Sequence, residues 1–248
     1  MKTQLAIDVG ATGIKGALVN IEDGTMISDR IKYATPKPAL PMDVALVMNN
    51  IIKDLNWTEG DIGIGFPAVV KNNMCFSASN IDKSWINIDI QKLIKEATGF
   101  NSHSINDADA AGLAEIAFGK GVDKNGTVIM LTLGSGIGSG IFKDGALLAN
   151  TELGRLTYRE SVAEHYASNN ARKTKDLKWD EYGDELNAFL EYVDKIFSPD
   201  LMIIGGGISK KFANYSHKIN PKLNVTDAKL RNNAGIIGAA MHAYQQQS

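Results

Sequence analysis

Two glycine-rich turns carry the residues of this 248-residue chain that are best suited to bind phosphate. The first runs from Asp8 to Lys15 as DVGATGIK, and the second from Thr132 to Ser139 as TLGSGIGS. Glycine lacks a Cβ, so the backbone N–H groups of such turns can converge on an anion. Gly10 would shape the first turn, where Asp8 would hold Mg²⁺ directly or through water, Thr12 would donate hydrogen bonds and Lys15 would neutralise phosphate charge. By itself this turn is equally compatible with a solvated edge, but a second turn favours phosphoryl chemistry.

The second turn offers small and hydroxyl residues where another phosphate would be cradled, namely Thr132, Gly134, Ser135 and Gly136. Two known kinds of phosphate loop do not fit the spacing. A dinucleotide fold needs Gly-x-Gly-x-x-Gly between a strand and a helix, and a Walker loop ends in Gly-Lys followed by Ser or Thr. Neither glycine-rich turn meets these patterns, and neither does Gly205-Gly206-Gly207. A hairpin type of phosphate loop remains.

A carboxylate suited to act as a base lies between the two turns. Asp107 follows a strand-like run and precedes the helical pattern Ala108–Phe118. Carboxyl ends of strands are where α/β proteins place their chemistry, and an aspartate there can accept the proton of an attacking alcohol. Asn106 would orient neighbouring hydroxyls by donating and accepting hydrogen bonds. The alternative is that Asp107 is only the N-cap of the helix.

Apolar residues alternate between strand-like and helix-like spacing along the chain, which is typical of an α/β protein. Glycine or proline follows most of the periodic runs, as expected where elements end. We expect strands at 5–8, 16–20, 26–33, 61–66, 127–133, 140–142 and 201–204, and helices at 44–55, 90–97, 108–118, 179–197 and 232–244.

The two halves of the chain repeat one pattern. Residues 5–18 align with residues 129–142, and this alignment matches Gly10 with Gly134 and Gly16 with Gly140. Two strand–turn–strand hairpins with the same glycine placement indicate duplicated lobes, each directing a tight turn at a shared cleft. The alternative is a coincidence between two glycine-rich hairpins.

Composition excludes several classes of protein. A net charge of −2 and a pI near 6.1 give no global reason to expect nucleic acid as a partner. The single cysteine, Cys75, can form neither an internal disulfide nor a thiolate zinc site, and we expect it to be buried. The chain leads straight into Leu5-Ala6-Ile7 without a secretory segment and has no apolar run long enough for a membrane span, so we expect a cytoplasmic protein.

Six segments together resemble one protein family. In their order and spacing they resemble the ROK (repressor, ORF, kinase) family of sugar kinases, and within it the polyphosphate glucokinase branch. The resemblance covers nearly the whole chain and is weakest over residues 158–178. The segments are Ile7–Gly16, Asn80–Trp85, Asn106–Glu115, Leu131–Ser139, Asn150–Gly154 and Leu230–Gly235.

The resemblance implies the fold and the roles of residues. The fold would be the two-lobed, actin-like α/β fold with the active site in the interlobe cleft, with residues 1–106 and about 232–248 in one lobe and 107–231 in the other. Asp107 would be the catalytic base for the 6-hydroxyl of glucose. Asn80, Asn106, Glu152 and Glu164 would hold the sugar, Gly205, Gly206 and Gly207 would line the donor end, and the two glycine-rich turns would bind phosphate with Mg²⁺. The protein would be a homodimer.

One departure from the family pattern leaves the substrate open. Family members usually follow the glutamate with Gly-His, and the histidine contacts the sugar, but Glu152-Leu153-Gly154 is followed here by Arg155. Arginine is permanently charged and only donates hydrogen bonds, so it would contact the sugar, pair with Glu152 or point outward. The alternatives are therefore a kinase for another hexose or for an amino sugar, and a sugar-binding protein without catalysis. The cysteine-rich zinc motif of other members is absent.

The phosphoryl donor is either polyphosphate or ATP. Polyphosphate needs an extended cationic track, whereas ATP needs a pocket for adenine. The residues that would form such a track are Lys15, Lys83, Lys120, Lys124, Lys210, Lys211 and Arg231. The same residues would serve equally well as scattered solvated charges.

Overall fold

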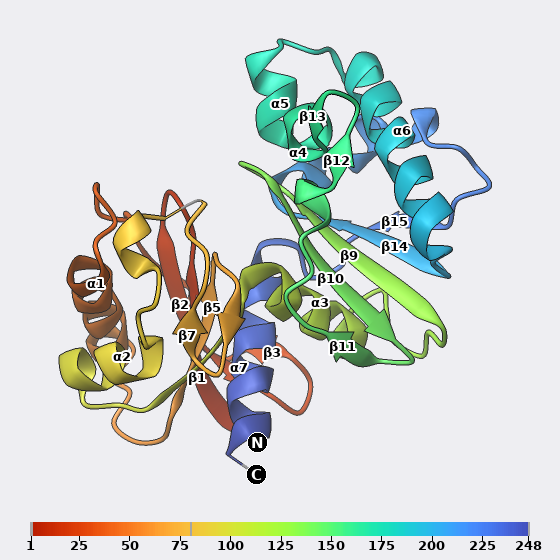
Figure 1. The fold of residues 1–248 in the computed structure, drawn as a ribbon. Coiled ribbons are helices and arrows are strands. Elements are labelled where there is room, and N and C mark those ends of the chain that lie inside the picture. The colour runs from red at the N-terminus through yellow and green to blue at the C-terminus, as the bar shows by residue number, and fades with distance from the viewer. Residues whose placement is uncertain (1, 80, 248) are drawn as a thin grey trace. The chain divides into compact units, whose positions relative to one another are not determined.

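The computed structural model describes residues 2–79 and 81–247, which form two compact units (Figure 1). Unit 1 comprises residues 1–114 and 233–248, and unit 2 comprises residues 115–232. Helix α3 (Asp107–Phe118) crosses from one unit into the other. The lobe boundaries expected above, 1–106 with about 232–248 and 107–231, stay a prediction.

The sheet of unit 1 places two of the predicted site residues at one edge. Strands β1 and β2 form an antiparallel hairpin, whereas β1, β5 and β8 run parallel. Parallel strands end at the same edge of a sheet, so Asp8 near the end of β1 and Asn106 at the end of β8 lie there on either side of β5. The order is β3 (Thr25–Met26), β2 (Ile14–Asn20), β1 (Thr3–Val9), β5 (Ile62–Phe66) and β8 (Ser102–Asn106), and β4 (Ile31–Tyr33) also pairs with β2.

Helices cover both faces of this sheet. Helices α1 (Pro41–Asp54) and α2 (Ile90–Thr98) lie on one face and α7 (Ala234–Gln246) on the other (Figure 1). Proline in the first turn of α1 pre-sets its φ angle, and Asp89 caps α2 by accepting from the N–H of Lys92. Gly99 ends α2 in the left-handed region, as the sequence predicts.

Helix α7 packs unusually closely on unit 1. A Cβ built on Gly63 of β5 would lie 2.1 Å from the carbonyl oxygen of Ala239, and one built on Gly238 would lie 1.7 Å from that of Ala110. Only glycine leaves room for backbones at these distances. The run of small residues in α7 therefore serves close packing.

Unit 2 repeats the strand order of unit 1. Its hairpin β9–β10 is antiparallel, and β9, β14 and β15 run parallel. The expected duplication is confirmed by this order, although Gly16 pairs with Ile7 whereas Gly140 pairs with Met130, so the two hairpins differ in register. The order is β11 (Ala146–Leu148), β10 (Ile137–Lys143), β9 (Thr127–Leu133), β14 (Leu201–Gly205) and β15 (Val225–Asp227).

One long helix supplies much of the core of unit 2. Helix α6 (Trp179–Phe197) buries Tyr182, Leu186 and Phe189 at helical spacing, and Ser198 ends it in the left-handed region. The remaining elements are short. They are the hairpins β6–β7 (Val70–Lys71, Met74–Cys75) and β12–β13 (Thr157–Tyr158, Ser161–Val162), helices α4 (Glu164–Ala167) and α5 (Asn169–Thr174), and the 3₁₀ turns η1 (Lys83–Trp85), η2 (Leu153–Arg155), η3 (Gly207–Asn214), η4 (Ser216–Lys218) and η5 (Arg231–Asn233).

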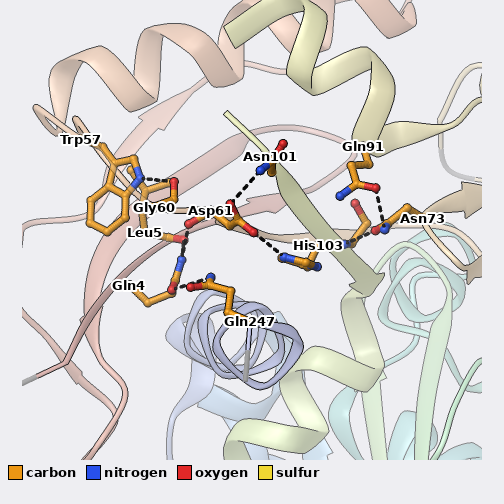
Figure 2. Close-up of polar contacts among 11 residues, drawn as sticks. Gln4, Leu5, Trp57, Gly60, Asp61, Asn73, Gln91, Asn101, His103 and Gln247 are labelled. Atoms are coloured by element: carbon orange, nitrogen blue, oxygen red, sulfur yellow. Dashed lines mark hydrogen bonds and ion pairs between the residues drawn. The ribbon is translucent and has the colours of Figure 1, made fainter. Parts of the chain in front are cut away.

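A polar network closes the edge of the unit 1 sheet opposite Asp8 and Asn106 (Figure 2). The Asp61 carboxylate accepts from Nδ2 of Asn101 at 3.2 Å and lies 2.8 Å from Nε2 of His103. Gln4 donates to the carbonyl oxygen of Asp61, and Gln247 donates to Oε1 of Gln4 at 3.3 Å. These contacts tie the beginnings of three strands to the end of α7.

Two expectations about elements are corrected. The single strand expected at 26–33 is two short strands, β3 and β4, each paired with β2. The terminal helix begins at Ala234 after the turn η5, two residues later than expected. Cys75 is fully buried, as predicted. Across residues 2–79 and 81–247, no helix combines the length and the apolar character that a membrane span requires.

Candidate active site

Asp8 and Lys15 lie side by side at the edge of the unit 1 sheet. They are paired across the β1–β2 hairpin, and Nζ of Lys15 donates to Oδ2 of Asp8 at 3.1 Å. The other carboxylate oxygen lies close to the backbone of two glycines, because a Cβ built on Gly235 would be 3.1 Å from Oδ1 and one on Gly65 would be 3.7 Å away. The two side chains therefore form one partly buried ion pair.

The first turn is closed by its own backbone. The N–H of Gly10 donates to the carbonyl oxygen of Gly13 at 3.1 Å, and Oγ1 of Thr35 donates to the carbonyl oxygen of Gly10 at 2.6 Å. Thr12 is exposed at the tip. The sequence pattern did not single out Thr35, because it lies in a segment without a recognisable motif, yet its hydroxyl anchors the turn.

Asn106, and not Asp107, caps helix α3. Its Oδ1 accepts from the N–H of Ala108 at 2.9 Å and from that of Asp109 at 3.1 Å, and its Nδ2 donates to the carbonyl oxygen of Ala68 at 3.0 Å. The alternative that made Asp107 the N-cap is therefore wrong. One N–H of the Asn106 amide is left to donate to a ligand.

Asp107 occupies the first helical position of α3. Its side chain is partly exposed, and its Oδ1 accepts from the N–H of Ala108 at 2.8 Å. A carboxylate at the end of a strand and the start of a helix is placed where it could accept the proton of a substrate hydroxyl.

The second turn is also closed by its own backbone, over a shorter span than the first, and is tied to helix α5. The N–H of Gly134 donates to the carbonyl oxygen of Gly136 at 3.0 Å, and the carbonyl oxygen of Gly134 accepts from the N–H of Asn170 at 3.0 Å. Thr132 pairs with Gly138, one position before the last pair of the β9–β10 hairpin, and Ser135 is exposed at the tip. Helix α5 therefore helps to hold the second turn in place.

Glu164 lies directly against the second turn. Its Oε2 accepts from the N–H of Ile137 at 3.2 Å and would lie 2.2 Å from a Cβ at Gly136, so only glycine fits there. The structure thus brings together Gly136 and Glu164, two residues that the sequence assigned to different subsites.

The triple glycine packs against the residue that leads into the tip of the same turn, Leu133. Gly206 has a φ of 75°, and a Cβ on it would lie 2.7 Å from the carbonyl oxygen of Leu133. Both the positive φ and the close approach require glycine. Gly205 ends β14, and Gly207 begins the turn η3, which carries Lys210 and Lys211. Gly206 therefore adjoins the beginning of the second turn, and the assignment of the three glycines to the donor end stays a prediction.

Arg155 pairs with Glu152. The Nε of Arg155 lies 3.5 Å from Oε2 of Glu152, and both side chains are partly exposed. Burial raises the pKa of the Glu152 carboxyl, Arg155 opposes that rise in pKa, and the Glu164 carboxylate adds to it. Of the three orientations open to Arg155, the structure has the one in which it neutralises part of the charge of Glu152.

Ser139 fixes the loop that carries Glu152. Its buried hydroxyl donates to the carbonyl oxygen of Thr151 at 2.7 Å and accepts from the N–H of Leu153 at 3.0 Å. A Cβ on Gly154 would lie 2.3 Å from the carbonyl oxygen of Ile137, so the loop also lies tightly on β10. From the sequence, Ser139 was expected only as the last residue of the second glycine-rich turn, and its role in fixing the loop of Glu152 was not predicted.

The remaining predicted residues take part in none of the contacts described above. Asn80 lies outside the described residues. Lys83, Lys120, Lys124 and Arg231 are exposed, and their arrangement along one groove stays a prediction. Within residues 2–79 and 81–247, no cluster of three or more histidine, cysteine, aspartate or glutamate side chains is arranged to hold a metal ion.

Comparisons with known proteins agree on one family. The sequence profile of the ROK family matches residues 4–161. A polyphosphate glucokinase of Mycobacterium tuberculosis (strain CDC 1551 / Oshkosh) is 39% identical over 236 residues, which cover 95% of this chain and 89% of the relative. The crystal structure of an inorganic polyphosphate/ATP-glucomannokinase from Arthrobacter sp. strain KM matches with a TM-score of 0.96 and 40% identity over 99% of this chain and 100% of that one.

A more distant structure is similar in fold. A glucokinase from Streptomyces griseus, solved in complex with glucose and AMPPNP, matches with a TM-score of 0.83 and 23% identity over 98% of this chain and 100% of that one.

Proposed function

This chain belongs to the ROK family and has its two-lobed, actin-like α/β fold, and we propose that it is a sugar kinase that transfers a phosphoryl group from polyphosphate or ATP to the 6-hydroxyl of glucose. The observation that carries the proposal is its similarity, over 95% of its length, to a polyphosphate glucokinase that is 39% identical. The geometry of the two turns and of Asp107 supports it independently.

Asp107 would act as the general base. It stands at the end of a parallel strand and at the start of a helix, and Asn106 does the capping, so the carboxylate of Asp107 is not needed for that purpose. In phosphoryl transfer to an alcohol, an aspartate that accepts the hydroxyl proton orients the nucleophile. The proton of the 6-hydroxyl would pass to Asp107 as the oxygen attacks the terminal phosphorus of the donor.

The two turns would bind the donor phosphates, and Asp8 would hold Mg²⁺. One carboxylate with the oxygens of a bound phosphate is a ligand set that Mg²⁺ accepts, because it retains several waters. Oδ2 of Asp8 is already paired with Lys15, so the metal would take Oδ1 directly or through water. Bound Mg²⁺ would neutralise charge on the phosphates, and Lys15 would add to this effect.

Glu152 and Glu164 would hold sugar hydroxyls as acceptors. The ion pair with Arg155 leaves Glu152 able to accept further hydrogen bonds, because a carboxylate has about four lone-pair positions. Arg155 itself would reach the sugar only as a donor. Mannose or an amino sugar in place of glucose, and sugar binding without catalysis, are the competing outcomes.

Substitution of the base tests the proposal. We expect Asp107→Asn to lower kcat by about 10²–10⁴-fold while glucose binding, measured by calorimetry, changes little. Asp29→Asn, the same change at an exposed aspartate of unit 1, should have no effect on either quantity. A variant at position 107 with a near-normal rate would refute the role of the base, and wild-type protein that binds glucose without turnover would refute the kinase.

Three finer points need their own measurements. Initial rates with ATP and with long-chain polyphosphate at matched phosphate concentration identify the donor. Rates over a panel of hexoses and amino sugars identify the acceptor. The homodimer and the cytoplasmic location remain predictions, which light scattering and cell fractionation test.

A further inference from the structure

A pocket of about 320 Å³ opens in unit 2 beside the second glycine-rich turn. Ser135, at the tip of that turn, lines it together with residues between 164 and 175, in and beside α4 and α5, among them Ser168, Asn170 and Lys175. Apart from Glu164, which would hold the sugar, no role has been assigned above to the side chains of the residues between 164 and 175 that line the pocket. They lie next to the turn that would hold a donor phosphate.

The wall is fixed relative to the turn. The backbone N–H of Asn170 donates to the carbonyl oxygen of Gly134 at 3.0 Å. Oγ of Ser168 accepts from the N–H of Ala171 at 3.0 Å, and this bond leaves the hydroxyl hydrogen of Ser168 to donate elsewhere. The pocket is therefore a formed feature of the unit, continuous with the turn.

The lining is rich in hydrogen-bond donors. Ser135, Ser168 and Thr174 contribute hydroxyls, Asn170 an amide, and Lys175 an ammonium group. Glu164, His165 and Ala171 complete the lining, so among the described residues that line the pocket the only ring is the imidazole of His165, and there is no Phe, Tyr, Trp, Leu, Ile, Val or Met. An adenine ring needs flat apolar surfaces on its faces, whereas a chain of phosphates needs donors and a positive charge. The lining fits phosphates better than a nucleobase.

Two charged residues decide the electrostatics. Lys175 is exposed, and its Nζ lies 4.5 Å from the centre of the Tyr166 ring, which holds the ammonium group near the wall. The one carboxylate in the lining, Glu164, lies against the turn, where its Oε2 accepts from the N–H of Ile137. Its negative charge is thus partly satisfied by the backbone.

We propose that this pocket binds the phosphates of a polyphosphate donor that lie beyond the group being transferred, with Lys175 as their counter-charge. The inference rests on the proposed kinase function and deepens it, because it places the extended part of the donor over α4 and α5. The lysines that the sequence suggested for this task do not include Lys175.

The test compares donors in a Lys175→Ala variant. We expect the ratio of kcat/KM for long-chain polyphosphate to kcat/KM for ATP to fall about 2–5-fold, the effect of one exposed ammonium–phosphate contact. The plot of log(kcat/KM) for polyphosphate against log salt concentration should become shallower by about 0.7, because one fewer counterion is released. Lys175→Arg, which keeps the charge, should restore both quantities.

Lys173→Ala is the matched control, since Lys173 is an exposed lysine of α5, two residues before Lys175, and does not line the pocket. It should leave the donor ratio unchanged. The inference would be overturned if the donor ratio stayed unchanged in Lys175→Ala or fell equally in Lys173→Ala. It would also be overturned if Lys175→Ala raised the KM for glucose and left the donor ratio unchanged. A wild-type enzyme that uses ATP but not polyphosphate would overturn it and leave the kinase intact, whereas no turnover with either donor would overturn the proposed function itself.

Discussion

Replacing Ser139 by alanine would remove the hydrogen bonds that hold the loop of Glu152 to strand β10. Its hydroxyl makes three contacts with this loop, at 2.7 Å to the Thr151 carbonyl oxygen, 3.0 Å to the Leu153 nitrogen and 3.2 Å to Oγ1 of Thr151. Ser139 is only 1% exposed and Leu153 only 4%. Water therefore has little access to replace the lost partner.

The cost follows from these contacts. The buried N–H of Leu153 loses its acceptor, which costs about 1–3 kcal/mol, and the lost donation to Thr151 adds about 1 kcal/mol. We expect a destabilisation of about 2–4 kcal/mol, which corresponds to a fall in Tm of about 4–15 °C for a chain of this size. Because the loop carries Glu152, the KM for glucose should rise more than the KM for the phosphoryl donor.

Thermal unfolding and steady-state kinetics at a temperature well below the transition measure both effects. Ser216→Ala, the same change at a partly exposed serine of unit 2, should leave Tm and both KM values as they are. A Ser139→Ala protein with an unchanged Tm would refute the energetic argument. A rise in the donor KM equal to that in the glucose KM would refute the link between Ser139 and the sugar.

Two further substitutions probe the packing and the charge of the site. Gly238→Ala would bring a methyl group into the carbonyl oxygen of Ala110, and we expect the free energy of unfolding, measured in urea, to fall by at least about 3 kcal/mol. Gln245→Ala, on the exposed side of the same helix, should not cause this loss. Arg155→Met would remove the positive charge that opposes the raised pKa of Glu152, and the pKa of Glu152 should therefore rise further. The acid limb of the pH profile of kcat/KM for glucose should then move to higher pH. An acid limb that stays in place or moves to lower pH would contradict this assignment.

Periodic elements with clear stop signals were predictable from the sequence. The strand at 127–133 and the helix at 179–197 have the expected bounds, because both combine strong periodicity with a turn or proline at the end. The segment 26–33 was not predictable, since its two short strands exist only through pairing with β2. Residues that pair over two or three positions leave no periodic pattern to read.

The site was predictable in its residue types but not in its contacts. Pattern reasoning identified Asn106 and Asp107 as a pair, yet only the fold reveals that Asn106 takes the capping role. It left three orientations for Arg155, and the ion pair with Glu152 selects one. Ser139 and Thr35 escaped notice because their partners lie 12 and 25 residues away in the chain, a separation that no local motif records.

The packing of α7 has a consequence for the order in which the protein is made. Unit 1 is discontinuous, and α7, which covers one face of its sheet, belongs to residues 233–248. Because a ribosome releases the chain from its amino terminus, every residue of unit 2 emerges before the helix that unit 1 needs. The apolar face that Gly63 and its neighbours present to α7 must therefore wait uncovered while unit 2 folds, and nascent chains at this stage are the ones that a chaperone would recognise.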